Sequence, residues 1–488
     1  MANLTREDIR SVIEIINELY LEDMIPWICG YSGGKDSTAV VQLVWYALRE
    51  LPPEKLKKTV HVISTDTLVE SPVVAIWATE SIEKMKKQAK DEGLPIVAHR
   101  LTPTTTNTFW VNLIGRGYPY PRRDFRWCTD RLKIDASNRF IKSILDAESE
   151  AIMVLGSRKA ESTVRKAVLE GYEKKRYRAH LSPNGSFPNS YVFTPIENWL
   201  NDNVWQYLVQ VPNPWGHSNK DLLAMYSGAS ADGECPLVID NSTPSCGNSR
   251  FGCWVCTMVT EDKSMAAMIQ NDEEKAWMLP MLEFRNEIAA DWQTDRDRRD
   301  FRRKDGRLTW HNNRLVHGPY TKETREYFLR RLLEVEKLIH EIGPAEIKDV
   351  PLITMDELRF IRQIWLDEKH EFDDSLPRIY EEVTGLPYED GLISKNKYFG
   401  APEEELLRTV CAELYPDEEL LAEMQRALLD TEAKAATISN KRNVILNFEK
   451  EIKKAFYRDE EEAEQIAEIR ARRATGIAEE IDPDDFVE

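Results

Sequence analysis

The sequence SGGKDS at residues 32–37 separates a short apolar run, PWICGY (26–31), from STAVVQLVWYAL (37–48), whose composition indicates a buried helix. Gly33 and Gly34 let the backbone approach a ligand without an intervening Cβ atom. At a strand-to-helix junction, the N–H groups of such a loop and of the first helical turn form an anion site. Lys35 adds a positive charge, and Ser32 and Ser37 can donate hydroxyl hydrogen bonds. The stretch therefore predicts a phosphate-binding loop.

The spacing of this loop differs from the P-loop pattern G-x-x-x-x-G-K followed by Ser or Thr, because only Ser32 separates Tyr31 from the glycine pair. A glycine-rich turn without a ligand is the simpler alternative. A lysine and two serines beside a glycine pair, however, serve no evident packing purpose at such a junction.

Strand and helix patterns alternate on both sides of the loop. An amphipathic helix is predicted over 5–21, strands over 59–64, 95–101 and 151–157, and helices over 71–89 and 131–145. This order predicts an α/β fold, a twisted parallel sheet with helices on both faces. Ligands of such sheets bind beyond the carboxyl ends of the strands, so the loops at 32–37, 65–70 and 157–162 are expected to face one cleft.

The composition changes twice along the 488 residues. We expect an α/β domain over 1–210, a cysteine-rich segment with many Pro, Gly and Ser residues over 211–262, and a mostly helical, charged region over 263–488. The main helical candidates in that region are 264–292, 321–341, 354–369 and 417–473.

Charge and hydropathy limit the function classes. No stretch approaches the roughly 18 apolar residues of a membrane helix, and MANLTREDIR has no apolar signal region, so we expect a cytoplasmic protein with no membrane contact. The formal net charge of −19 argues against nucleic-acid binding through the overall field. A nucleic-acid substrate would need a local basic patch or a partner protein.

Four of the seven cysteines fall in the pattern C-x10-C-x6-C-x2-C: Cys235, Cys246, Cys253 and Cys256. Disulfides are not expected in a long cytosolic chain. Four thiolates with a tight C-x2-C pair suit either zinc or a 4Fe–4S cluster, and the spacing alone does not choose between them.

Three further segments carry a resemblance to a known superfamily. They are Thr65-Asp66-Thr67 with Glu70, the segment GSRKAES (156–162), and PIENW (195–199) followed by NVW (203–205). Together with SGGKDS, and in this order, they resemble the phosphoadenosine phosphosulfate (PAPS) reductase-like branch of the PP-loop ATP pyrophosphatases, the adenine nucleotide alpha-hydrolase-like proteins. The resemblance implies that ATP is cleaved between its α and β phosphates, releasing AMP and pyrophosphate.

The resemblance also implies roles for individual residues. Asp66 is expected to hold the ribose or a Mg²⁺ ion, and Arg158 to neutralise charge on the α-phosphate, with Glu161 orienting it; a surface salt bridge is the alternative for each. The expected nucleotide-binding residues are Ser32, Gly33, Gly34, Lys35, Asp36, Ser37, Asp66, Gly156 and Arg158. The expected catalytic residues are Lys35, Asp36, Arg158 and Cys128.

A more specific resemblance runs from about residue 20 to about residue 325. The segments VPNPWGHSNK (211–220), GASADGECPL (228–237), TPSCGNSRFGCWVCT (243–257), FWVNLIGRGYP (109–119) and RWCTDRLKI (126–134) are similar to the DndC family of bacterial DNA phosphorothioation. This resemblance implies a 4Fe–4S cluster rather than zinc, and a role in placing sulfur on the DNA backbone. It also implies partner subunits of the same system and a cysteine desulfurase as sulfur donor.

The sulfur carrier is expected to be Cys128, because Arg126 and Arg131 would favour its thiolate. The cluster could instead deliver sulfur or only brace the fold. Cys29 is expected to be a small core residue, and Cys411 to be structural.

The DNA contact has two candidate sets. Basic residues between 296 and 307 are interleaved with acids, so a salt-bridged face is as good an interpretation as a phosphate track. Arg122, Arg123 and Arg126 are better placed. We expect weak intrinsic DNA binding, with partners presenting the DNA.

Three other functions remain open at this point. A PAPS reductase would not consume ATP, and its C-terminal Glu-Cys-Gly motif is not found here. An RNA thiolation enzyme would share the chemistry but differ in substrate. A nucleotide-sensing scaffold would show no turnover.

Overall fold

The computed structural model describes residues 4–122, 125–229, 252–389, 400–416, 419–436 and 444–474. The chain divides into two compact units. The first comprises Met1–Thr108, Pro121–Arg285 and Ile339–Val350, and the second comprises Phe109–Tyr120, Asn286–Leu338 and Pro351–Glu488. None of the described helices is long and apolar enough to cross a membrane.

The first unit is built on a six-stranded sheet of order β3-β2-β1-β4-β6-β5. Its strands are β1 (Trp27–Gly30), β2 (Val60–Thr65), β3 (Ile96–Leu101), β4 (Ala151–Val154), β5 (Ser182–Pro183) and β6 (Ser190–Phe193). All neighbours are parallel except β5, which pairs antiparallel to β6. The predicted parallel α/β sheet is confirmed. The two strands at the β5 edge were not predicted.

Alternating side chains bury both faces of this sheet. Trp27, Cys29 and Val62 belong to one core cluster, whereas Ile28 and Ile63 belong to another. Because successive residues of a strand point to opposite faces, this division means that each face carries its own apolar layer. Cys29 is fully buried, as expected of a small core residue.

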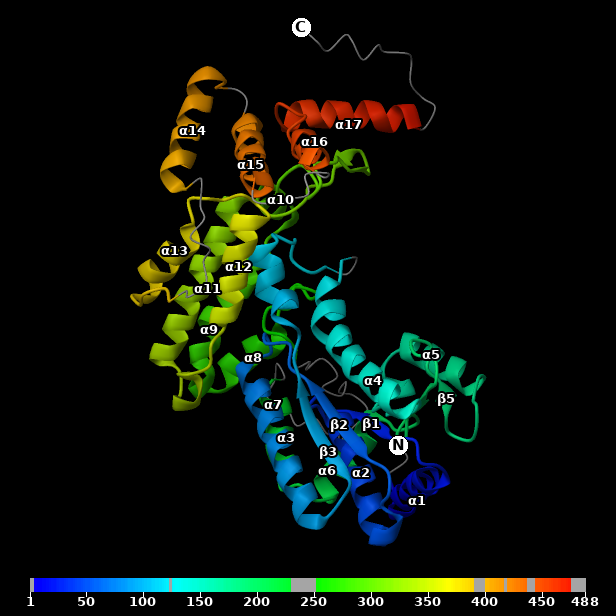
Figure 1. The fold of residues 1–488 in the computed structure, drawn as a ribbon. Coiled ribbons are helices and arrows are strands. Elements are labelled where there is room, and N and C mark those ends of the chain that lie inside the picture. Colours follow the sequence, from blue (N-terminus) through cyan, green and yellow to red (C-terminus); the bar gives the residue numbers. More distant parts are fainter. Residues whose placement is uncertain are drawn as a thin grey trace. The chain divides into compact units, whose positions relative to one another are not determined.

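Helices cover both of these layers (Figure 1). The first cluster includes residues of α1 (Arg6–Glu22), α2 (Lys35–Glu50), α3 (Pro72–Glu92) and α6 (Asn201–Gln210), and the second includes residues of α4 (Asp135–Glu148). The unit also contains α5 (Thr163–Glu173), α7 (Asn219–Gly228) and α8 (Lys263–Asn271), and α9 (Leu279–Ile288) begins in it. Helices on both faces leave only the strand ends open for a site.

The second unit is mostly helical, as predicted. Its helices are α10 (Trp292–Asp297), most of α11 (Lys322–Ile342), α12 (Met355–Asp367), α13 (Ser375–Thr384), α14 (Ala401–Leu414), α15 (Glu419–Ala436), α16 (Val444–Lys454) and α17 (Glu460–Ala474). A short hairpin, β7 (Trp310–His311) and β8 (Arg314–Leu315), lies among them.

A segment from the N-terminal half of the chain belongs to this helical unit. Residues 109–120 include a π-helical turn, Val111–Gly115. The indole of Trp110 donates to the carbonyl of Leu352 at 2.7 Å, and that of Trp365 donates to the carbonyl of Ile114 at 3.1 Å. Both bonds are buried, so the segment is an integral part of the helical core.

Candidate active site

Residues 32–37, the phosphate loop, connect β1 to α2 in a compact turn. Gly33 has a φ of 76°, a conformation that favours glycine, and its carbonyl accepts a hydrogen bond from the Trp77 indole at 3.2 Å. The Ser37 hydroxyl donates to the Gly34 carbonyl at 3.0 Å. Gly34 is the N-cap of α2 and has no side chain to accept from the first-turn N–H groups. Apart from the Lys35 N–H, which donates to the Tyr226 hydroxyl at 3.5 Å, those groups are directed to the space above the helix, where an anion would sit.

A single carboxylate in this loop contacts two cations. Asp36 accepts from the Arg158 guanidinium at 2.6 Å and from the Lys35 ammonium at 3.1 Å. Arg158 is 3% exposed and also donates to the carbonyl of Trp199. One negative charge between two fixed positive charges leaves a net positive site. A phosphate group is the natural third partner.

The loop after β4 contacts the phosphate loop directly. A Cβ atom on Gly156 would lie 2.9 Å from the backbone carbonyl of Asp36, so only glycine fits there. The loops at 32–37 and 157–162 thus contact each other at one edge of the sheet, whereas the cleft expected there stays a prediction. Glu161 accepts from the backbone N–H of Arg158 at 3.0 Å, so it fixes the backbone of that loop, whereas Asp36 orients the guanidinium.

Tyr226, on α7, completes the loop and was missed from the sequence. Its hydroxyl lies 3.5 Å from the backbone N of Lys35, and the Lys35 ammonium lies 5.6 Å from its ring centroid. A Cβ atom on Gly34 would lie 3.1 Å from the same hydroxyl. Burial raises the pKa of Tyr226, so the hydroxyl stays protonated. No motif marks this tyrosine, because it reaches the loop only through the packing of α7.

Asp66 follows β2 and is engaged by an arginine of the neighbouring strand. Its carboxylate accepts from the backbone N–H of Leu68 at 2.9 Å and pairs with Arg100 at 3.2 Å. Arg100 also lies 3.7 Å from Glu70, whose pKa is raised by burial. The salt-bridge alternative for Asp66 therefore holds in this structure, and its role toward ribose or Mg²⁺ stays a prediction.

The segment at residues 252–260, the cysteine turn, is attached to the chain that leaves β2. Cys253 forms an antiparallel bridge with Glu70, and the N–H of Trp254 donates to the Val69 carbonyl at 2.9 Å. The hydroxyl of Thr67 lies 3.3 Å from the Cys253 sulfur. Since β1 and β2 are adjacent and parallel, the cysteine turn lies at the same sheet edge as the phosphate loop.

Three thiols share the electrostatic surroundings of one ammonium group, that of Lys133. Burial opposes the charge of Lys133, but Cys253, Glu70, Cys256 and Cys128 together outweigh it and raise the pKa of the lysine. Burial raises the pKa of Cys253 to about 11, although Lys133 acts in the opposite direction. The fold thus brings Cys128, which is far away in sequence, into the electrostatic surroundings of the C-x2-C pair. No sequence motif indicates this proximity.

The expected activation of Cys128 is wrong in its physical basis. Burial raises the pKa of the Cys128 thiol; a hydrogen bond with Thr129 partly offsets this, and the nearby Cys256 adds to it. Arg131 donates to the Asn107 side chain at 2.6 Å, and Arg126 is exposed. In this arrangement Lys133 is the cation that the thiols share.

The structure describes two of the four cysteines predicted to bind the cluster. Cys235 and Cys246 lie outside the described residues. Cys253 and Cys256 lie on one tight turn, with the Cys256 N–H donating to the Cys253 carbonyl at 3.0 Å, which suits a metal clamp. Among described residues, no group of three or more His, Cys, Asp or Glu side chains is placed to hold a metal ion. The described pair fits a cluster, and the four-cysteine set stays a prediction.

Arg285, on α9, supports the cysteine turn through hydrogen bonds to its backbone. Its fully buried guanidinium donates to the carbonyls of Cys256 at 2.8 Å, Thr260 at 2.9 Å, and Val259. Three carbonyls directed at one cation fix the path of the chain directly after the second cysteine. No motif indicates this role, because Arg285 lies in an ordinary charged helical pattern.

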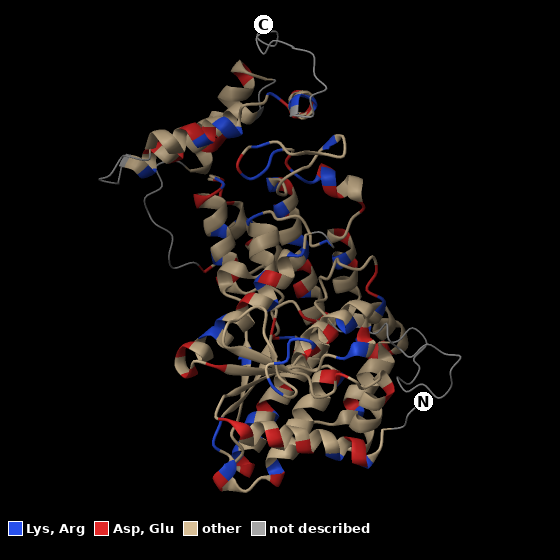
Figure 2. Ribbon diagram, turned by 90° about the vertical axis from the view of Figure 1, so that its right-hand side faces the viewer, with Lys and Arg blue, Asp and Glu red and all other residues tan. Residues whose placement is uncertain are grey.

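The two candidate DNA-binding sets differ in the structure. In the basic run, Arg299 pairs with Asp295 at 3.3 Å, and Arg302 pairs with Asp300 at 2.7 Å. Arg299 and Arg302 are buried in these pairs, whereas Lys304 and Arg307 pair with Glu368 and Asp305 on the exposed surface, so these four residues follow the salt-bridged alternative. Figure 2 shows basic and acidic residues interspersed along the helices. Arg122 and Arg126 belong to the first unit, and Arg123 lies outside the described residues.

Solved structures and one curated protein resemble parts of the chain. An uncharacterized protein of Methanocaldococcus jannaschii is 26% identical over 210 residues, 42% of this chain; the chain spans about a third (36%) of that relative. A PAPS reductase from Candida auris is 13% identical, with 44% of this chain and 91% of that chain covered at a TM-score of 0.25. A U34-tRNA thiolase from Methanococcus maripaludis with its 4Fe–4S cluster is 12% identical, with 58% and 80% covered at a TM-score of 0.29.

The N-terminal α/β region matches a described family. The match to the phosphoadenosine phosphosulfate reductase domain covers residues 26–215. This range begins just before β1 and includes the phosphate loop, Asp66, Gly156 and Arg158. The parallel sheet and the loop contacts at its carboxyl edge agree with that assignment. Residues 26–215 are therefore a PAPS reductase-like domain with a PP-loop fold.

Proposed function

We propose that the chain binds ATP on the phosphate loop, cleaves it to AMP and pyrophosphate, and uses the adenylyl group to activate a DNA phosphate for replacement of oxygen by sulfur. The observation that carries this proposal is the placement of Lys35, Asp36 and Arg158 at the start of α2, with three thiols at the exit of the adjacent strand. Phosphate chemistry and sulfur chemistry would then share one sheet edge.

The phosphate loop supports the ATP part of the proposal. The first-turn N–H groups and Lys35 would hold the β and γ phosphates, while Arg158 neutralises charge that develops on the α-phosphate. Asp36 keeps both cations in position before the nucleotide binds. If Mg²⁺ binds with the nucleotide, the carboxylates of Asp66 and Glu70 on the adjacent loop would hold it, and the ion would neutralise phosphate charge.

The reaction has two displacements at phosphorus. A non-bridging oxygen of the DNA phosphate attacks the α-phosphorus of ATP, and the bond from that phosphorus to the bridging oxygen breaks as pyrophosphate leaves. A sulfur nucleophile at the oxidation level of sulfide then attacks the DNA phosphorus, and AMP leaves with the original oxygen. Positioning and charge neutralisation provide most of the catalysis.

The cysteine thiols support the sulfur-transfer part of the proposal. In this proposal Cys235, Cys246, Cys253 and Cys256 hold a 4Fe–4S cluster, which would supply a site for handling sulfur and electrons when bound. In this proposal Cys128 accepts the incoming sulfur as a persulfide, and an external dithiol reductant releases that sulfur at the oxidation level of sulfide, becoming a disulfide as Cys128 returns to the thiol. Lys133 would balance negative charge on the thiols.

DNA as substrate rests on the resemblance of the 211–257 and 109–134 segments to phosphorothioation proteins. The net charge of −19 and the internal pairing of the basic run favour weak intrinsic binding. Partner subunits of the same system would present the DNA, and a cysteine desulfurase would supply sulfur.

Anaerobic purification with iron and sulfide assays, followed by ATP–pyrophosphate exchange in the presence of DNA, tests the proposal. Exchange should be present in the native chain and in Arg165→Ala, a matched arginine outside the phosphate loop, and lost in Lys35→Ala. Nuclease digestion should then release phosphorothioate dinucleotides when partners are added. Sulfur found in tRNA instead would favour RNA thiolation, and no exchange with any nucleic acid would refute the ATP step.

A PAPS reductase-type activity is a second candidate, favoured by the domain match over residues 26–215. That reaction would release sulfite from PAPS in the presence of a thiol reductant and would consume no ATP. Measuring sulfite formation and AMP formation on the same preparation separates the two.

A further inference from the structure

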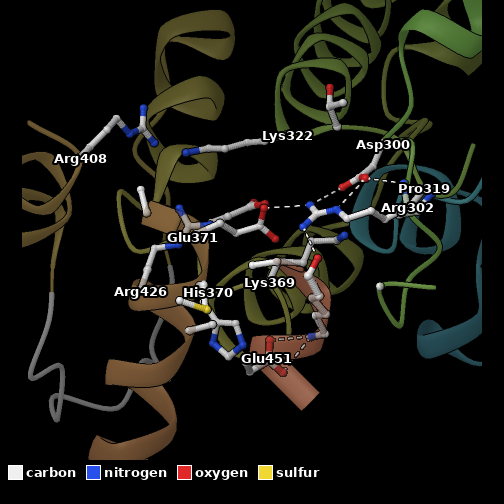
Figure 3. A pocket seen from close by; sticks show the side chains of 18 of the residues that line it. Asp300, Arg302, Pro319, Lys322, Lys369, His370, Glu371, Arg408, Arg426 and Glu451 are labelled. Carbon is white, nitrogen blue, oxygen red and sulfur yellow. Dashed lines mark hydrogen bonds and ion pairs between the residues drawn. The ribbon is translucent and has the colours of Figure 1, made fainter. Parts of the chain in front are cut away.

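The helical unit contains a cavity of about 710 Å³ that the proposed chemistry does not use (Figure 3). The loop at 300–306, the start of α11, the residues after α12, and helices α14, α15 and α16 line it. Ligand pockets for small molecules fall in the range of roughly 300–1,000 Å³. The cavity is therefore of a size that suits one small ligand.

Its lining is more basic than the rest of the chain. Ten lining residues are Lys or Arg and seven are Asp or Glu, whereas acids outnumber bases in the whole chain by 84 to 65. Figure 3 shows Lys322, Arg408, Arg426 and Lys369 around the same hollow. A local excess of positive charge in an acidic protein needs a specific explanation.

Three acidic residues of the wall are already paired with arginines of the same wall. Glu371 forms a buried pair with Arg325, and Arg302 lies 2.7 Å from Asp300 and 2.9 Å from Glu423. These carboxylates are satisfied by their own arginines and offer little to a further cation.

Three other arginines of the wall have fewer than one carboxylate partner each among the described residues. Glu404 is shared by Arg426 at 2.7 Å and Arg408 at 3.3 Å, so one carboxylate serves two guanidinium groups. Arg303 donates to the carbonyl of His317 and makes no ion pair with any described residue. Each of these positions leaves positive charge at the cavity.

Lys369 is the most informative of these residues. Its ammonium makes neither a hydrogen bond nor an ion pair within the described ranges. Burial, reinforced by the guanidinium of Arg325, lowers its pKa to about 7, although Glu371 acts in the opposite direction. Lys304 lowers this pKa further and Asp300 raises it. Within the described ranges, the Lys369 side chain thus has no directly bonded partner of opposite charge.

We propose that this cavity is a second anion site, which binds a small phosphate-bearing ligand through Lys369, Arg303 and Arg408. A phosphate group would supply the counter-charge that the wall lacks, and charge-assisted hydrogen bonds from several elements would hold it. The site lies wholly within the helical unit. It does not depend on the proposed function of the phosphate loop.

Lysine acylation of the full native chain tests the proposal, with inorganic pyrophosphate as the probe. An amine with a pKa near 7 is largely unprotonated at pH 7.5 and reacts readily with an N-hydroxysuccinimide ester. Mass spectrometry should show that pyrophosphate slows labelling of Lys369 at least fivefold. Lys450, an exposed lysine on α16, is the matched control and should not change. Unchanged labelling of Lys369 would overturn the proposal.

Separate readouts distinguish this site from the phosphate loop. Lys35 labelling reports the loop in the same experiment, so either site can fail alone. Calorimetry in a Lys35→Ala background should show pyrophosphate binding that Lys369→Met weakens about tenfold and Lys450→Met leaves unchanged. Protection of Lys369 by single-stranded DNA but not by pyrophosphate would replace a small ligand by nucleic acid and refute the proposal. If Lys369→Met does not fold, the labelling of the native chain decides.

Discussion

Replacing Gly156 by alanine would place a methyl group against the first turn of α2. The new Cβ atom would lie 2.9 Å from both the carbonyl carbon and oxygen of Asp36, and 3.1 Å from the backbone N of Ser37. These are backbone atoms of a helix start, so no flexible side chain can move aside. Either β4's exit loop or the phosphate loop must shift by a few tenths of an ångström.

The cost can be estimated from this geometry. Overpacking of this kind costs about 1–3 kcal/mol of unfolding free energy. For a unit of this size that corresponds to a decrease of roughly 2–10 °C in its melting temperature. The shift also moves Asp36 and hence the Lys35–Arg158 arrangement, and small misplacements of catalytic groups lower rates by about 10²-fold. ATP–pyrophosphate exchange and thermal unfolding measure the two effects.

Gly171→Ala is the matched control. A Cβ atom there meets nothing within 4 Å, and the residue lies in α5, where alanine should stabilise the protein by about 0.5–1 kcal/mol. Exchange should be unaffected. Normal exchange and normal stability in Gly156→Ala would refute the close packing of the two loops and, with it, the site built on them.

Three further outcomes are expected. Arg158→Ala should lower the exchange rate by about 10²–10³-fold while Arg165→Ala does not, because only the former reaches the phosphate loop; equal rates would remove Arg158 from the mechanism. His61 lies 3.1 Å from His99, and burial lowers its pKa to about 4. Its contribution to stability is therefore complete above about pH 6.5 and is lost as the pH falls toward 4. His61→Phe should flatten the decline of melting temperature between pH 7 and 5, and an unchanged slope would contradict this. Arg285→Met leaves three carbonyls of the cysteine turn without their hydrogen-bond donor. The variant should bind less iron in anaerobic preparations, while circular dichroism shows that the sheet stays folded. Undiminished iron content would mean that the turn needs no such support.

The phosphate loop and the cysteine turn are connected through one element. The chain leaving β2 contacts the cysteine turn through Val69 and Glu70, and α3, which follows it, reaches the phosphate loop through Trp77. The Trp77 ring stacks on His217 with 3.6 Å between centroids. A change at the cysteines would therefore be transmitted to the loop by a packed, hydrogen-bonded path.

Local sequence patterns predicted the sheet and the phosphate loop well. Each strand of the β1–β4 core is a short apolar run, and the loop is marked by residues whose conformation or charge is unusual. The strand β6 and the short β5 were missed, because they lie in LSPNGSFPNSYVF (181–193), a stretch rich in the turn-forming residues Pro, Gly, Asn and Ser. The charged residues at helical spacing predicted the helical character of the second unit. They did not predict that residues 109–120 belong to it.

The candidate site was only partly predictable for a related reason. Gly156 and Arg158 were recognisable from their motif, whereas Tyr226, Arg100 and Lys133 lie on helices or strands with no special local pattern. Arginine and lysine occur throughout this chain, so their roles depend on which carboxylate or thiol the fold brings near. Sequence spacing carries no such information.

The sequence by itself determined the β/α alternation, the glycine-dependent loop and the residue types that suit phosphate and sulfur, since these follow from backbone propensity and side-chain chemistry within a few residues. Only the tertiary structure decided that Asp36 pairs with Arg158 as well as with its neighbour Lys35, and that Cys128 shares the electrostatic surroundings of Cys253 and Cys256. The two approaches bring together residues about 120 positions apart, which no local pattern relates, and burial there raises the pKa of the Cys128 and Cys253 thiols.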